Sequence, residues 1–187
     1  MKNKKKINFG RRGIKKIRFQ GDFIRVIVKN QWEYVQRVNC RGVVIIVALT
    51  KDKKVLFVEQ YRLPLGKRAI EFPAGLVNDR QRGQGQESVA SAAKRELLEE
   101  TGYRAKKIIP WLKGPVSGGL TSDCVTMVRA LNIKKISSGG GDETEDLVIH
   151  EIPLNRVPRW LQRMERKGYA IEPKIYAGLY FLRQYNK

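Results

Sequence analysis

The stretch that decides the fold runs from Glu87 to Tyr103 and reads ESVASAAKRELLEETGY. Its apolar residues recur about every three or four positions, a spacing that places them on one face of an α-helix. These residues are Val89, Ala92, Ala93 and Leu97. Gly102 stands where helices commonly end in a left-handed cap, a conformation that glycine adopts without a steric penalty. The pattern therefore predicts an amphipathic helix that ends at Gly102.

The acidic residues of this helix suggest a site for a divalent cation. Glu96 and Glu100 are four residues apart and share one face of the helix, and Glu99 lies beside them. Stacked carboxylates repel each other unless a cation lies between them, and Mg²⁺ is typically held by one or two carboxylates together with substrate phosphates. The alternative is an ordinary solvated surface on which Arg95 and Glu99 form an ion pair.

The order of residues in this stretch resembles a family signature. Glu87 is followed, after seven residues, by Arg-Glu-Leu-Leu-Glu-Glu-Thr-Gly-Tyr, which resembles the Nudix box of the Nudix hydrolases. The glycine of that box corresponds to Gln81, so Gly75, in Glu71-Phe-Pro-Ala-Gly, is the candidate replacement. Residues 78–86 would then hold an insertion of about six residues, polar and glycine-rich as expected of a surface loop.

Four other segments resemble the ADP-ribose/nucleoside-diphosphate-sugar pyrophosphatase branch of this family, and the resemblance covers about residues 21–182. The segments are Gln60-Tyr-Arg62, Glu71-Phe-Pro-Ala-Gly75, Gly119-Leu-Thr-Ser122 and Tyr176-Ala-Gly-Leu-Tyr180. The resemblance implies hydrolysis of the pyrophosphate bond of ADP-ribose or another nucleoside diphosphate sugar, dependent on Mg²⁺ or Mn²⁺. The products would be a nucleoside monophosphate and a sugar phosphate. Gly118 stands where ADP-ribose hydrolases commonly carry a proline, so the resemblance to them is incomplete there.

The resemblance also implies a set of metal ligands. Ala74 would offer its backbone carbonyl to the metal. Glu96 and Glu100 would be the principal carboxylate ligands, with Glu99 assisting them.

Catalytic roles follow from the same resemblance. Arg95 would orient Glu99 or Glu87 rather than contact the substrate, and Glu87 would be structural. Glu145 matches an additional acidic residue of the family that binds metal or activates water, with Glu143 as the alternative for this role.

The resemblance also implies five residues that bind the substrate. Trp32 would stack on the base, with Glu33 and Arg37 nearby. Arg62 would contact the diphosphate or adjoining groups, and Leu76 would also line the substrate site. The alternatives are that Trp32 only covers an edge strand and that Arg62 is an ordinary surface arginine.

The chain divides into three regions. Residues 1–20 are expected to form a basic, flexible arm, residues 21–40 an N-terminal antiparallel strand region, and residues 41–187 the catalytic domain. In the branch that the chain resembles, the N-terminal strands exchange between the subunits of a homodimer, and each active site is built from both chains. A solvated arm is favoured over an arm that binds nucleic acid.

The expected fold class is an α/β/α sandwich with a mixed sheet, since strands and helices alternate along residues 41–187. A turn at 51–54 should make 55–61 the hairpin partner of 42–49, a continuous β-branched run expected to be buried on both faces. The expected strands are 23–28, 32–38, 42–49, 55–61, 108–112, 124–131 and 147–152, and the further helices are 155–167 and 173–185.

The composition and charge of the chain limit the classes of function that it can have. The chain has 187 residues and a formal net charge of +20, which favours an anionic substrate or partner. No apolar run reaches membrane-spanning length and no secretory signal is visible, so we expect a cytoplasmic protein without membrane contact. Cys40 and Cys124 lie in apolar segments and are expected to be buried thiols in a reducing compartment.

Two rival functions remain at this point. One is a Nudix enzyme that acts on RNA 5′ ends, with the basic arm binding the RNA backbone. The other is a Nudix-fold RNA-binding module without catalysis. Such modules usually lose the glutamates of the box, whereas this chain keeps Glu96, Glu99 and Glu100.

Overall fold

The structure, a computed structural model, describes residues 13–77, 86–141 and 146–185. Its central sheet has the strand order β7-β4-β10-β9, in which β4 and β10 run parallel and the two outer strands antiparallel to their neighbours. These strands are β4 (Gly42–Ala48), β7 (Ala74–Val77), β9 (Lys107–Pro115) and β10 (Cys124–Leu131). The buried position of β4 in this sheet agrees with its continuous apolar sequence.

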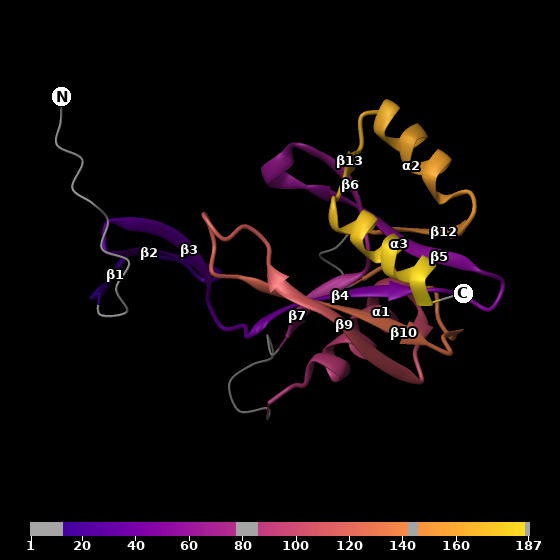
Figure 1. Cartoon of the computed structure of the whole chain (residues 1–187), viewed down its shortest axis with the longest axis horizontal. Helices are drawn as coiled ribbons and strands as arrows, with labels where there is room; N and C mark the ends of the chain where they lie inside the picture. Colours follow the sequence, from indigo (N-terminus) through magenta and orange to yellow (C-terminus); the bar gives the residue numbers. More distant parts are fainter. Residues whose placement is uncertain (1–12, 78–85, 142–145, 186–187) are drawn as a thin grey trace.

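A second sheet has the order β12-β5-β6-β13, and together with the central sheet it forms the main part of the molecule, called the body below (Figure 1). Its strands are β5 (Lys54–Arg62), β6 (Lys67–Glu71), β12 (Val148–Pro153) and β13 (Ala170–Ile171), and the short 3₁₀ helix η1 (Leu63–Leu65) connects β5 to β6. The expected hairpin between residues 42–49 and 55–61 is wrong. The described residues join these segments by an isolated bridge between Leu49 and Val55, because β4 and β5 belong to different sheets.

Helices cover both sides of this body (Figure 1). On one side lies α1 (Val89–Thr101), and on the other lie α2 (Val157–Arg166) and α3 (Lys174–Tyr185). Successive side chains of a strand point to opposite faces, so β4 contributes to two cores: Val44 packs with α1, and Ile45 packs with α2 and α3. The predicted α/β/α class with a mixed sheet is confirmed. Within the described residues, no helix combines the length and apolar character needed to cross a membrane.

The helix α1 has a cap at each end. At its start, the Ser88 hydroxyl accepts a hydrogen bond from the Ser91 N–H at 3.1 Å. At its end, Gly102 has a φ of 74°, which confirms the predicted left-handed stop. A Cβ at Gly102 would lie 2.1 Å from the Ser137 carbonyl oxygen, so a larger residue would not fit. The chain then forms the short antiparallel pair β8 (Tyr103–Arg104) and β11 (Lys134–Lys135).

A separate antiparallel sheet projects from the body at the N-terminal end (Figure 1). It contains β1 (Lys15–Gln20), β2 (Ile24–Lys29) and β3 (Trp32–Arg37). The strands β2 and β3 agree with the predicted antiparallel region. Residues 15–20, expected in the basic arm, form the strand β1 instead. All six residues of β1 are exposed, so no buried apolar face marks them as a strand.

The third strand of this sheet also pairs with the connection between β9 and β10. The Val35 N–H donates to the Leu120 carbonyl at 2.8 Å, and the Ser122 N–H donates to the Val35 carbonyl at 3.1 Å. These bonds attach the N-terminal sheet to the body.

Candidate active site

The segment Ala74-Gly75 at the start of β7 lies against two carboxylates of α1. The Ala74 N–H donates to Glu100 Oε2 at 3.1 Å. A Cβ placed on Gly75 would lie 1.9 Å from the carboxyl carbon of Glu96, so the glycine leaves the space that this carboxylate occupies. Glu100 is only 4% exposed, and a buried carboxylate requires hydrogen bonds or cations that compensate its charge. Three of the four residues expected to hold a metal, Ala74, Glu96 and Glu100, thus lie at one place.

Arg95 lies at the centre of the acidic residues of the helix. Its guanidinium binds both carboxylate oxygens of Glu87, at 3.1 and 3.3 Å, as well as Glu99 at 3.0 Å and Glu96 at 2.8 Å. It also donates to the Leu76 carbonyl at 3.2 Å. Burial lowers the pKa of Arg95, but its bonds to the carboxylates outweigh burial and raise the pKa above its ordinary value. Arg95 therefore stays charged and links α1 to β7.

The atoms at this place suit a hard divalent cation. Carboxylate and backbone carbonyl oxygens are the ligands that Mg²⁺ prefers, and Ala74, Glu96 and Glu100 supply these atom types. The Glu99 side chain is 52% exposed and lies at the same end of the helix. Across the part of the chain that the structure describes, no three acidic, histidine or cysteine side chains form a metal cluster by themselves. Mg²⁺ usually binds one or two protein carboxylates, and substrate phosphates complete its coordination.

Three of the residues expected to bind substrate lie on β3. The Trp32 indole N–H donates to the Gly119 carbonyl at 3.2 Å, and Arg37 pairs with Asp123 at 3.0 Å. Glu33 is exposed on the same strand. Gly119 and Asp123 both belong to the connection between β9 and β10, so these contacts lie where the N-terminal sheet meets the body.

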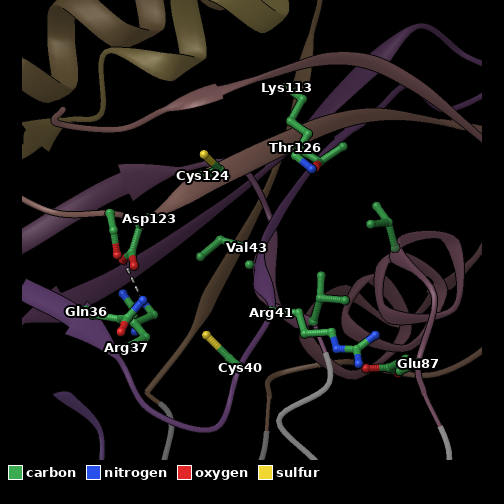
Figure 2. A pocket seen from close by; sticks show the side chains of 14 residues that line it. Gln36, Arg37, Cys40, Arg41, Val43, Glu87, Lys113, Asp123, Cys124 and Thr126 are labelled. Carbon is green, nitrogen blue, oxygen red and sulfur yellow. Dashed lines mark hydrogen bonds and ion pairs between the residues drawn. The ribbon is translucent and has the colours of Figure 1, made fainter. Parts of the chain in front are cut away.

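A pocket of about 500 Å³ lies between this junction and the start of α1 (Figure 2). Arg37 lines it from the N-terminal sheet, Asp123 from the end of the connection between β9 and β10, and Glu87 from the segment before α1. Cys40 and Cys124 also line it. The expectation that both cysteines are buried is wrong: Cys124, the first residue of β10, is exposed, and Cys40, which precedes β4, is half-buried, because both line this pocket.

Arg62 lies at the end of β5 and binds a carboxylate close to β7. Its Nε donates to Glu71 Oε1 at 2.9 Å, and its Nη2 donates to Glu71 Oε2 at 2.5 Å. Glu71 precedes Ala74 by three residues, so this bidentate ion pair connects Arg62 to the segment that lies against α1. The sequence analysis did not identify Glu71 as its partner.

The predicted loop acid Glu145 and its alternative Glu143 lie outside the described residues, as do positions 78–85 of the expected insertion. The chain before the loop is attached to α1, since the Gly141 N–H donates to the Glu99 carbonyl at 3.0 Å. The segment that leads to both candidate acids therefore starts at the acidic end of the helix.

A polar cluster on the second sheet fixes the chain after this loop. Arg68 binds Asp146 at 2.6 Å and Glu59 at 2.5 Å, and His150 lies 2.8 Å from the other oxygen of Glu59. The His150 ring also packs on Trp160, with ring centroids 5.1 Å apart. His150 is thus part of a structural cluster. The sequence analysis missed this cluster, although a glutamate inside the apolar run of β5 was a signal for a buried ion pair.

Comparisons with known proteins agree with this geometry. The NUDIX domain model matches residues 39–160. A methanol dehydrogenase activator of Bacillus methanolicus is 32% identical over 122 residues, which cover 65% of this chain and 63% of that protein. An ADP-ribose pyrophosphatase of Bacillus subtilis is 30% identical over 136 residues, which cover 70% of each chain. A crystal structure of an ADP compounds hydrolase has the same fold, with a TM-score of 0.66 and 22% identity over 91% of this chain and 93% of that one. The chain therefore belongs to the Nudix family and is a Nudix hydrolase.

Proposed function

We propose that this enzyme hydrolyses the pyrophosphate bond of ADP-ribose or another nucleoside diphosphate sugar, giving a nucleoside monophosphate and a sugar phosphate. The observation that carries the proposal is the meeting of Ala74, Glu96 and Glu100 beside Gly75. It gathers oxygen donors for a cation on α1, and the start of the same helix lines a pocket of about 500 Å³. The similarity to an ADP-ribose pyrophosphatase supports the same substrate class.

The proposed reaction depends on Mg²⁺, with Mn²⁺ as the alternative. The ion would be held by Glu96, Glu100 and the Ala74 carbonyl, with Glu99 assisting. When bound, it would neutralise phosphate charge that repels a nucleophile and make a water molecule more acidic. Arg95 would act as a positioning residue, because it holds Glu99 in place through a direct ion pair.

The proton acceptor in this scheme is Glu145, with Glu143 as the alternative. A carboxylate can remove a proton from the attacking water. The water oxygen forms a bond to one phosphorus atom, the bridging P–O bond breaks, and the bridging oxygen leaves with the other phosphate. Arg62 would contact the diphosphate, and Leu76 would line the substrate site.

The proposal includes a homodimer whose N-terminal sheets complete the active sites. Trp32 would stack on the base, with Glu33 and Arg37 nearby. Exposed aromatic side chains on that sheet support an interface: Phe23 is 78% exposed and Phe19 is 56% exposed.

A hydrolysis screen tests the proposed substrate class. It would compare ADP-ribose, other nucleotide sugars, dinucleoside polyphosphates and triphosphorylated RNA, each with Mg²⁺ and with Mn²⁺. We expect the highest kcat/KM for a nucleotide sugar, with a nucleoside monophosphate among the products. Cleavage of triphosphorylated RNA without cleavage of any nucleotide sugar would overturn the proposal in favour of an enzyme acting on RNA ends.

A further inference from the structure

The outer side of α2 carries a row of basic side chains that the proposed active site does not use. The row consists of Arg156, Arg159, Arg163, Arg166 and Lys167, all exposed. At about 100° per residue, the five lie within about 100° of one another around the helix axis. Glu165, the acidic residue of α2, lies outside this arc.

No acidic side chain among the described residues neutralises these positive charges. In the part of the chain that the structure describes, the ion pairs involve other side chains, and none of the five basic residues takes part in one. Grouped cations without acidic partners repel each other, and an anionic partner would remove that repulsion.

A groove of about 480 Å³ lies along this row. It is lined by Arg156, Arg159 and Arg163, together with Trp160 and the end of β12. Three members of the row thus line the groove as well. The helix α2 itself lies at the outer edge of the body, on the side opposite α1 (Figure 1).

The surroundings of α2 argue against a membrane as the partner. A helix that binds a membrane surface buries its own apolar face among the lipids. The apolar face of α2 is already buried in the protein core, where Val157, Leu161 and Met164 pack with α3 and the sheets. The solvent-facing side of α2, which carries the basic row, is the side available to a partner.

We propose that the row and the groove bind the phosphate backbone of a single strand of nucleic acid. Guanidinium groups bind phosphates in a bidentate manner, which favours arginine at such sites. Arg159 and Arg163 are about 6 Å apart along the axis, and the row from Arg156 to Arg166 spans about 15 Å, enough for a few consecutive phosphates. A single row of cations matches a single backbone. The net charge of +20 adds a long-range attraction for a polyanion.

The test is a binding titration with a fluorescently labelled strand of about 20 uridines, followed by anisotropy at several salt concentrations. The key variant carries Arg159→Gln, Arg163→Gln and Arg166→Gln. A matched control removes the same charge from the exposed strand β1, by Lys15→Gln, Lys16→Gln and Arg18→Gln. Thermal unfolding of each variant checks that the fold is intact.

We expect the α2 variant to bind at least about tenfold more weakly near 0.1 M salt, with the slope of log K against log salt reduced by about 2. The β1 control should change binding by no more than about threefold. Equal losses in the two variants would contradict the site, since net charge alone would then explain binding. Absence of binding by the intact chain, or equal competition by polyglutamate at the same charge concentration, would also overturn the proposal, the latter in favour of an acidic protein partner.

Discussion

Gly75 has no side chain, yet it controls the position of a carboxylate in the proposed metal site. A Cβ on this residue would lie 1.9 Å from Cδ of Glu96 and 2.0 Å from its Oε1. Because these atoms are the end of a flexible side chain, an added methyl group would displace the carboxylate and leave the backbone in place. The carboxylate that moves is the one that we assign to the cation.

Gly75→Ala should therefore reduce turnover of a nucleotide sugar by about 100-fold and raise the Mg²⁺ concentration needed for half-maximal rate. The melting temperature should change little. The matched control is Gly114→Ala in β9, where a Cβ would meet nothing within 4 Å. Initial rates over a Mg²⁺ series provide the measurement. Full activity in both variants would show that catalysis does not depend on this position of the Glu96 carboxylate.

At the scale of elements, the second sheet is tied to the chain beyond the loop by Arg68. This arginine on β6 joins Glu59 of β5 to Asp146, which lies two residues before the first residue of β12. The Glu59 carboxylate is buried, with 6% of the residue exposed, and its contacts with Arg68 and His150 compensate that burial. Removal of one partner of a buried ion pair leaves an uncompensated charge, which costs more than the pair contributes.

Arg68→Ala should lower the free energy of unfolding by about 2–3 kcal/mol, because Glu59 would lose its arginine. Adding Glu59→Gln to Arg68→Ala should recover part of this loss, since no buried charge would remain unpaired. Urea unfolding of both variants gives the comparison. A double variant less stable than the single one would show that charge compensation is not the role of Arg68.

A second element contact makes stability depend on pH. Burial raises the pKa of Glu151 in β12, but hydrogen bonds from Tyr103 and Lys135 outweigh burial and lower the pKa below its ordinary value. The ionised carboxylate therefore stabilises the folded state fully above the unfolded pKa of about 4.3, and this contribution is lost as the pH falls through the lower folded value.

The stability difference between the wild type and Glu151→Gln should be largest near neutral pH and shrink below about pH 4. Urea midpoints across pH test it, and a difference independent of pH would rule it out.

Elements with a strong local pattern were predictable from the sequence, and elements defined by pairing were not. The helix α1 has helical periodicity and a glycine stop, and β4 is a continuous apolar run. In contrast, β7 is a four-residue strand that contains Ala74 and Gly75, so its strand character comes from pairing with β4. The site shows the same division. Residues of α1 are close in sequence, whereas the pair Arg68–Asp146 joins positions 78 residues apart, and no local pattern links them.

At the scale of the whole molecule, the N-terminal sheet leaves apolar surface exposed and carries three of the expected substrate-binding residues. A three-stranded sheet with exposed Phe19, Phe23 and Trp32 gains stability if a second copy covers it.

We expect sedimentation at micromolar concentration to show a homodimer. Phe23→Asp should weaken the dimer and lower activity together, whereas Val148→Asp, which removes an exposed apolar side chain from the body, should leave the dimer intact. A fully active monomer would contradict the shared active site.

We assign the carboxylates beside Ala74 to the catalytic metal. The turnover of Glu100→Gln is the measurement that decides this assignment. Glutamine keeps an oxygen that can accept the Ala74 N–H bond but removes the negative charge. With the nucleotide sugar that the wild type cleaves best, this variant should lose about 100-fold to 1000-fold in kcat at an unchanged melting temperature. The control Glu165→Gln, an exposed carboxylate on α2, should keep wild-type turnover. A Glu100→Gln variant that folds normally and turns over at near the wild-type rate would contradict the account.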